Sequence, residues 1–330
     1  MKLNFRKLIL GTASIALCAA CRAHGESFEE TSADPLTTGT PGEVTRSADA
    51  GSSDGEGGTV GQGSFRPHWE DGTTCATTPP VEVWKYTAST YIFRQSICTN
   101  FEAPFLYLLL GDTRALLLDS GTGHADVRVP VETAMAEWIQ LKGLASLPLV
   151  VAHTHSHGDH VKGDSFFRNR PNTTVVGYPP QQVATFFTLT QWPTGSATFD
   201  LGGRVLDVVP LPGHESAHIA IYDTKEQILF TGDTLYPGRL YIQNWNSYRS
   251  SVRRLVDFID TRQLPVSWVL GAHIEMSTTP GQDYAFQTLK HPNEHALPQP
   301  IERLRELDTA AQAMGSTPRR ETHPDFIIYP

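Results

Sequence analysis

The sequence predicts a four-layer α/β sandwich, in which two sheets pack face to face and helices cover their outer sides. Two observations support this class. The apolar segments form two strand-rich blocks, and helical stretches are interleaved with the strands of each block. Strands and helices also do not follow the regular alternation that is typical of a single parallel sheet.

The first block contains short apolar or alternating runs that predict strands, at residues 81–86, 91–94, 105–110, 115–118, 149–152 and 173–177. A tight turn at residues 111–114 joins the third and fourth of these strands. Helical spacing predicts a helix over residues 127–142 and a shorter one over 181–188. The residues expected on the inward face of the longer helix are Val127, Val131, Ala134, Trp138 and Leu141.

The second block predicts strands at residues 205–211, 219–222, 228–231 and 266–270. A helix is expected over 248–261, with an inward face of Val252, Leu255, Val256 and Ile259. The last amphipathic stretch, 300–314, predicts a helical extension at the C-terminal end of a domain that covers residues 65–330.

The N-terminal residues resemble a targeting segment. Basic residues at positions 2, 6 and 7 precede an apolar run over 8–20, which is too short to span a bilayer. This arrangement predicts a secretory signal peptide over residues 1–23 and therefore an exported protein.

The end of this segment also resembles a bacterial lipobox, in which Cys21 becomes the lipidated first residue, although Cys18 stands where leucine is usual. We expect a periplasmic, outer-membrane or cell-surface lipoprotein whose contact with a membrane is limited to an anchor at Cys21. Ordinary cleavage near Ala20 or Ala23 is the alternative. Residues 24–64 are rich in small, polar and acidic residues, so they predict a disordered linker.

Two cysteines follow the predicted signal, Cys75 and Cys98. An even number of cysteines in an exported chain favours a disulfide bond between them. Two buried free thiols are the alternative.

Composition limits the partners. The 330 residues are 39% hydrophobic and 18% charged, as in soluble globular proteins. The net charge of −9 argues against a nucleic-acid partner, because phosphate binding needs a basic surface. A small-molecule substrate is expected instead.

Three histidines and an aspartate are crowded into one short segment directly after the predicted strand 149–152. They are His155, His157, Asp159 and His160. Imidazole and carboxylate groups are ligands for zinc and similar divalent ions. Further residues of these types follow other predicted strands, namely His214, Asp233 and His273. Strand ends that converge at one edge of a sandwich can assemble such residues into one site.

The order of these motifs resembles the metallo-β-lactamase superfamily. Its pattern is a strand-ending Asp, a His-x-His-x-Asp-His block, a lone His, a bridging Asp and a final His. The chain matches it with Asp119, residues 155–160, His214, Asp233 and His273, over roughly residues 85–275. The resemblance implies an αββα sandwich.

The resemblance also implies roles for these residues. One metal ion would be held by His155, His157 and His214, the other by Asp159, His160 and His273, and Asp233 would bridge the two. Two zinc ions are expected, although some relatives hold iron or manganese. Asp159 would additionally orient the nucleophile, and Asp119 would steady a ligand histidine through a hydrogen bond. The alternative for Asp119 is a cap of the turn after its strand.

The expected activity is that of a zinc-dependent hydrolase. Two neighbouring cations can generate a hydroxide that attacks the carbonyl of an ester, lactam, lactone or thioester. A β-lactamase-like activity is one reading, and a glyoxalase II-like thioesterase or a lactonase is the alternative. The chain has no clear run of basic residues for glutathione, which weakens the thioesterase reading.

Two hypotheses of other classes remain. One is an iron-dependent persulfide dioxygenase, and the other is a metal-dependent binding module without activity. The complete second site, with Asp159, His160 and His273, argues against the dioxygenase, and the complete ligand set argues against a binding module. His157 also favours the hydrolytic branch, since oxygen-reducing diiron relatives commonly carry Glu there.

Other polar residues near the motifs have structural interpretations. We expect His153 to end a buried strand and His218 to support the site without binding metal. Tyr236 and Tyr241 are expected to pack or to lie at the surface, and the alternative is that either donates a hydrogen bond to an oxyanion in the substrate cleft. The remaining histidines of the C-terminal part are not expected to bind metal: His291, His295 and His323.

Overall fold

The computed structural model describes residues 63–330. The predicted signal peptide, Cys21 and the predicted linker up to residue 62 lie outside the described residues. Within the described part, none of the helices has the length and apolarity needed to cross a membrane.

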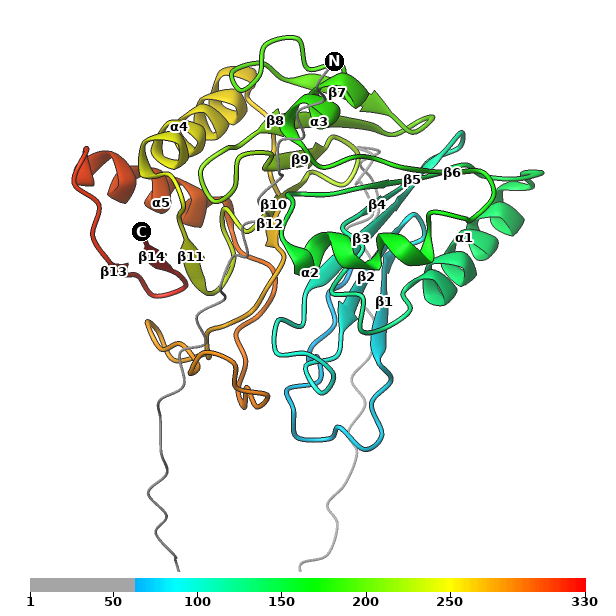
Figure 1. The fold of residues 1–330 in the computed structure, drawn as a ribbon, viewed down its shortest axis with the longest axis horizontal. Coiled ribbons are helices and arrows are strands. Elements are labelled where there is room, and N and C mark those ends of the chain that lie inside the picture. Colours follow the sequence, from blue (N-terminus) through cyan, green and yellow to red (C-terminus); the bar gives the residue numbers. More distant parts are fainter. Residues whose placement is uncertain (1–62) are drawn as a thin grey trace, which may run out of the picture. The chain divides into compact units, whose positions relative to one another are not determined.

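One face of the sandwich is a six-stranded sheet in the order β1-β2-β3-β4-β5-β6. The strands are antiparallel from β1 to β4, and β5 and β6 continue parallel to β4. Helix α1 covers the outer side of this sheet (Figure 1). The bounds are β1 Val81–Thr87, β2 Thr90–Gln95, β3 Phe105–Leu110, β4 Ala115–Leu118, α1 Arg128–Lys142, β5 Leu149–Ala152 and β6 Thr173–Val175.

The second sheet has five strands in the order β12-β10-β9-β8-β7. Helices α4 and α5 pack side by side on its outer face, so the expected C-terminal extension forms part of this outer layer. The bounds are β7 Ala197–Asp200, β8 Val205–Pro210, β9 Ile219–Asp223, β10 Ile228–Gly232, α4 Trp245–Arg262, β12 Trp268–Gly271 and α5 Ile301–Met314.

Smaller elements complete the described chain. A three-stranded sheet in the order β11-β14-β13 lies beside α5 (Figure 1). Its strands are β11 Arg239–Tyr241, β13 Glu321–Thr322 and β14 Ile327–Tyr329, and the short helices are α2 Gly158–Val161, the 3₁₀ helix η1 Lys162–Phe166 and α3 Pro180–Phe186.

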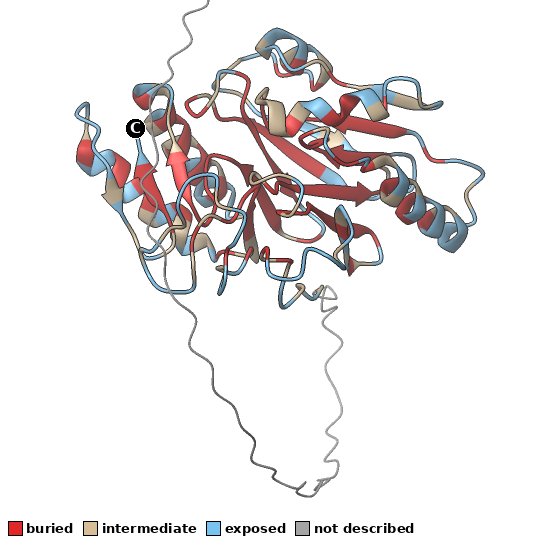
Figure 2. Ribbon diagram, turned by 60° about the horizontal axis from the view of Figure 1, so that its bottom comes forward, coloured by how far each residue is buried: buried red, intermediate tan, exposed pale blue. Residues whose placement is uncertain are grey.

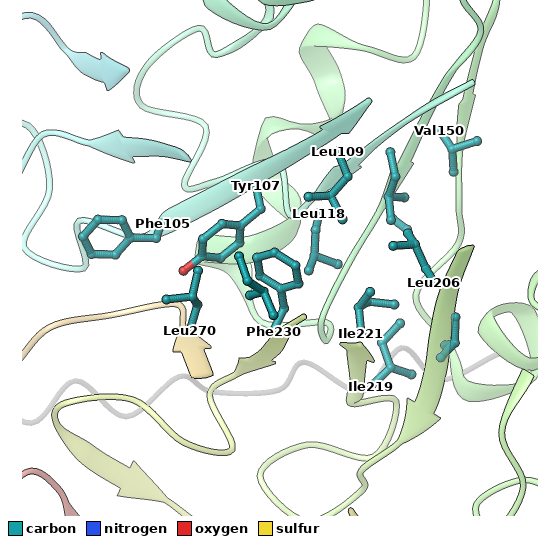
Figure 3. Packing of buried hydrophobic residues seen from close by; sticks show 14 of the residues in the cluster. Phe105, Tyr107, Leu109, Leu118, Val150, Leu206, Ile219, Ile221, Phe230 and Leu270 are labelled. Carbon is teal, nitrogen blue, oxygen red and sulfur yellow. The ribbon is translucent and has the colours of Figure 1, made fainter. Parts of the chain in front are cut away.

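The main core lies between the two sheets (Figure 3). Alternate residues of each strand face it, as Phe105, Tyr107 and Leu109 do in β3. The intervening residues Leu106 and Leu108 face α1 instead. Both faces of the central strands are therefore buried (Figure 2), which explains why these strands read as continuous apolar runs.

The structure confirms the predicted four layers, and most predicted elements agree to within a few residues. The prediction was wrong for Leu141, whose side chain is 64% exposed because it lies in the last turn of α1, just before the left-handed Gly143 ends the helix. The predicted inward face of α4 is buried. Strands β7, β11, β13 and β14 and helix α2 were not predicted.

Cys75 and Cys98 form the predicted disulfide, with their Cα atoms 5.4 Å apart. It ties the segment before β1 to the loop after β2. Replacing both cysteines by serine should lower the free energy of unfolding by about 3 kcal/mol, because the unfolded chain regains loop entropy. Urea unfolding measures this loss. The unaltered protein in reductant is the control and should lose a similar amount, whereas equal stability of all three samples would contradict the prediction.

Candidate metal centre

The candidate ligands lie where strands of both sheets end. His155 and His160 follow β5, His214 follows β8, Asp233 follows β10 and His273 follows β12. Strand β5 belongs to the first sheet and the other three strands to the second. The structure thus brings together residues more than a hundred positions apart, as the motif order predicts.

The first group consists of His155, His157, His214 and Asp233. His155 Nε2 lies 2.9 Å from His157 Nδ1, and His214 Nε2 lies 3.0 Å from the same Nδ1 atom. The two Nε2 atoms of His155 and His214 are 3.2 Å apart. Asp233 Oδ2 completes the group at 3.4 Å from His214 Nε2 and 3.8 Å from His155 Nε2.

The second group consists of Asp159, His160, His273 and again Asp233. Asp159 Oδ2 lies 3.1 Å from His160 Nε2 and 3.2 Å from His273 Nε2. Asp233 presents its other oxygen, Oδ1, at 3.6 Å and 3.5 Å from the same two nitrogens. One carboxylate therefore contributes to both groups.

These groups fit divalent metal ions by two criteria. Four ligands at the usual zinc distances of about 2.0–2.1 Å form a tetrahedron with edges of roughly 3.3 Å, close to the donor separations in both groups. In addition, Asp233 Oδ1 is buried and has no hydrogen-bond partner among residues 63–330. A buried carboxylate oxygen without a partner is costly, and a cation would satisfy it.

Two glycines allow the ligand loops to approach closely. Gly213 has φ +153°, and a Cβ atom there would lie 2.3 Å from the backbone of Tyr248. Gly232 has φ +49°, and its Cβ would lie 2.7 Å from Thr154. The residues that follow these glycines are His214 and Asp233, so glycine at both positions is a condition for placing two ligands.

Three of the candidate ligand histidines form a hydrogen bond through Nδ1, the ring nitrogen that faces away from the donor groups. Nδ1 of His214 donates to the carbonyl of Tyr241 at 2.6 Å, and Nδ1 of His273 donates to the carbonyl of Glu102 at 2.8 Å. Nδ1 of His160 donates to Asp119 Oδ2 at 2.8 Å. Such contacts fix the tautomer and leave Nε2 free to bind a metal ion.

Asp119 forms the hydrogen bond to a candidate ligand histidine that the sequence suggested, and it also caps the start of the loop that follows β5. Besides its contact with His160, its Oδ1 accepts from the backbone N–H of Thr154 at 2.7 Å. The Thr154 hydroxyl donates to Asp119 Oδ2 at 2.9 Å and lies 3.1 Å from His155 Nδ1. One buried carboxylate thus supports a histidine from each group and fixes the start of the loop that carries them.

The histidines differ in their tendency to hold protons. Burial, followed by repulsion from neighbouring imidazoles, holds the pKa of His155 well below its ordinary value. Burial likewise lowers the pKa of His214, although Asp233 opposes this shift. Both rings are therefore neutral at physiological pH, which is the form that binds metal.

The second group has the opposite character. Burial opposes a positive charge on His273, but Asp233 and Asp159 outweigh it and raise the pKa of His273 to about 10. His160 likewise has a pKa raised well above its ordinary value by the surrounding carboxylates, against the effect of burial. These protons balance the carboxylates in the metal-free protein, and a bound cation would replace them.

His218 supports the site, as expected. Its ring stacks on His155 with centroids 5.0 Å apart, and its Nε2 accepts the backbone N–H of Asp233 at 3.1 Å. Burial holds the pKa of His218 well below its ordinary value, so the neutral ring keeps this acceptor.

Replacing His218 by alanine should therefore weaken metal binding about 10–100-fold, because the shared carboxylate of Asp233 loses its backbone anchor. Competition with a chelator measures the affinity. The exposed His124 gives a control variant, H124A, that should retain full affinity. Equal affinities of the two variants would contradict the assigned role.

The other predicted residues have structural contacts. His153 Nε2 pairs with the buried Asp164 at 2.7 Å, so it ends a buried strand as expected. Tyr236 is buried and its hydroxyl donates to the carbonyl of Arg239. The C-terminal histidines pair with carboxylates outside the two groups: His291 with Glu294, His295 with Asp325 and His323 with Glu306.

Sequence reasoning missed several groups that support the ligands. The carbonyls of Tyr241 and Glu102 carry no side-chain signature, so no pattern could have revealed them. Thr154 could have been noticed, since it directly precedes the histidine block and a hydroxyl there can bridge Asp119 to the ligands.

Two groups of histidine and aspartate donors at the strand ends of an αββα sandwich define a metal-binding protein. The model of the metallo-beta-lactamase superfamily matches residues 100–273, more than half of the chain. The protein therefore belongs to this superfamily, whose members typically bind a metal such as zinc.

Several similar proteins share one name, hydroxyacylglutathione hydrolase. A hydroxyacylglutathione hydrolase of Rhizobium meliloti (strain 1021) is 28% identical over 160 residues, which are 47% of this chain and 61% of that protein. One of Chelativorans sp. (strain BNC1) is 31% identical over 146 residues, 43% of this chain and 56% of that protein. The chain thus spans less than two thirds of these relatives.

Among solved structures, a metallo-beta-lactamase from Pontibacter korlensis is similar at 19% identity, with a TM-score of 0.44. The match covers 70% of this chain and 99% of that one.

Proposed function

We propose that the protein is a metal-dependent hydrolase that cleaves a thioester of a small acyl group. The observation that carries this proposal is the pair of donor groups joined by Asp233, in a chain similar to proteins named hydroxyacylglutathione hydrolase. These relatives favour the thioesterase alternative over the β-lactamase-like reading. The chain has no clear run of basic residues for glutathione, which weakened the thioesterase alternative. That absence concerns binding of the glutathione part of the substrate, and it does not concern cleavage of the thioester.

We propose that each donor group holds one metal ion. Metal ions held there would lower the pKa of a water molecule toward neutrality and polarise a carbonyl oxygen. His155, His157, His214 and Asp233 would hold the first ion, and Asp159, His160, His273 and Asp233 the second, both proposed to be zinc. Elemental analysis of the purified protein tests this assignment. One iron in place of two zinc ions would support the dioxygenase hypothesis instead.

The candidate ligands differ in their exposure to solvent. His157 and Asp159 are partly exposed, whereas His155, His160, His214, Asp233 and His273 are buried. Asp159 is thus a carboxylate that both faces solvent and belongs to a donor group. Burial opposes its ionisation, but His160 and His273 outweigh this and hold the pKa of Asp159 below its ordinary value. Asp159 therefore stays ionised and can accept a hydrogen bond from the attacking water and orient it.

The experiment is a substrate panel for the full, zinc-loaded chain. It contains a hydroxyacylglutathione thioester, an aryl ester, a lactone and a β-lactam. We expect the largest kcat/KM for the thioester. A largest value for the β-lactam would overturn the thioesterase assignment and keep the hydrolase, whereas no turnover of any member would overturn both.

We also propose that the protein is exported and anchored through a lipid on Cys21. The proposal is supported by the basic and apolar composition of residues 1–20 and by the lipobox-like segment before Cys21. Fractionation of cells that express the protein or its C21A variant tests it. The unaltered protein should be found with membranes and the variant in the soluble exported fraction. Cytoplasmic protein in both cases would contradict export.

A further inference from the structure

His157 is oriented differently from the other candidate ligands. The remaining histidines turn Nε2 toward the donor groups, whereas His157 turns Nδ1 inward, at 2.9 Å from His155 Nε2 and 3.0 Å from His214 Nε2. Its Nε2 atom lies 2.9 Å from the side-chain amide nitrogen Nε2 of Gln243. Gln243 is an exposed residue between β11 and α4, and none of the motifs includes it.

The tautomer of His157 decides whether it can bind a metal ion. A neutral imidazole carries one proton, so Nδ1 offers a lone pair only when the proton is on Nε2. The Nε2–H group then needs an acceptor, and solvent or a side chain must supply it. The carboxamide of Gln243 is at hydrogen-bond distance from this atom and can present its oxygen by a half-turn of the amide.

The segment around Gln243 is itself fixed. The Tyr241 carbonyl, two residues earlier, accepts from His214 Nδ1 at 2.6 Å. The backbone N–H of Asn244 donates to the carbonyl of Gly213 at 2.8 Å, and the Asn244 side chain caps α4 by accepting from Ser247 N–H at 2.9 Å. Residues 241–244 therefore contact two of the three histidines of the first group, His214 and His157, through the ring nitrogens that face away from the donor group.

We propose that Gln243 is the positioning residue of His157. Its amide oxygen accepts the Nε2–H of His157 in the metal-bound protein, which keeps the proton off Nδ1 and directs that atom toward the first ion. In the metal-free protein the same amide can turn and donate its N–H to an unprotonated Nε2. An amide satisfies both states, because it carries a donor and an acceptor on one planar group. The inference rests on the proposed metal centre and is independent of the substrate.

The test compares Gln243→Leu, which can neither donate nor accept, with Gln243→Glu, which only accepts as a carboxylate. Asn246→Ala, at an exposed position in the first turn of α4, is the matched control. Zinc affinity and stoichiometry of the full chain are measured by competition with a chelator. We expect Gln243→Leu to weaken the binding of one of two zinc ions by about 10–100-fold. Gln243→Glu and Asn246→Ala should retain the affinity of the unaltered protein or exceed it.

A second readout reports the tautomer directly. A long-range ¹⁵N–¹H spectrum of the zinc-loaded protein should show His157 with its proton on Nε2, and this signal should shift in Gln243→Leu but not in Asn246→Ala.

The proposal is overturned if Gln243→Leu binds both ions as tightly as the unaltered protein. Equal damage by Gln243→Glu and Gln243→Leu would also overturn it, because an acceptor would then not matter. Failure of the unaltered chain to bind zinc at all would overturn both this proposal and the metal centre. An inactive substrate panel together with the expected loss of affinity would leave the role of Gln243 supported and reject only the proposed hydrolase.

Discussion

Replacing His157 by alanine is expected to lower turnover of the proposed thioester substrate by more than about 100-fold. Loss of residues that only support a metal ligand already costs about 10–100-fold in activity or metal affinity. His157 supplies the Nδ1 atom that lies between the Nε2 atoms of His155 and His214. Without it the first group retains two imidazoles and a shared carboxylate. The fold should persist, because the side chain is partly exposed and its removal opens no apolar cavity.

Steady-state kinetics measures the loss, and circular dichroism with thermal unfolding measures the fold. The control is H124A, which removes an exposed imidazole outside both donor groups. It should be as active as the unaltered protein. Normal turnover by the His157→Ala variant would show that the first group is not the reactive site.

Replacing Arg204 by methionine should destabilise the protein by about 3–5 kcal/mol, because it leaves a carboxylate buried without its charge partner. The side chains of Arg204 and Asp223 are 1% and 0% exposed, and they form an ion pair. Arg204 also donates to the carbonyl of Ser89 at 2.6 Å and to Thr90 Oγ1 at 2.8 Å. Thr90 is the first residue of β2 and Ser89 directly precedes it, whereas Arg204 directly precedes β8, so this arginine joins the two sheets.

Urea unfolding of the Arg204→Met variant gives the change in free energy. The double variant with Asp223→Leu is the informative control, because replacement of both charges by apolar groups removes the unpaired carboxylate. It should recover part of the lost stability. A single variant within about 1 kcal/mol of the unaltered protein would indicate that water reaches this ion pair.

The fold could be predicted well where burial alone shapes the sequence. Strands β3, β4 and β5 were predicted with their observed bounds, because both of their faces are covered and every residue is apolar. Strands β11 and β14 are three residues long and pair with each other across more than eighty positions. No local pattern records such a pairing, so these strands could not be predicted.

The candidate ligands could be predicted because their chemistry and order are unusual. Their supports were harder to see. Asp119 was identified from the motif order, but the carbonyls of Tyr241 and Glu102 are chemically the same in any residue. Gln243 resembles any other polar residue of a loop, and only its distance from His157 Nε2 distinguishes it.

The small sheet has a consequence for the order of biosynthesis. Strand β14 pairs in parallel with β11, and the backbone N–H of Ile242 donates to the carbonyl of Tyr329 at 3.0 Å. The stretch that touches His214 and His157 from behind is thus fastened by residues 327–329. Every candidate ligand is synthesised before these residues. The support behind His214 and His157 is therefore incomplete until β14 has paired with β11, so the centre takes its final form only once these late residues have folded.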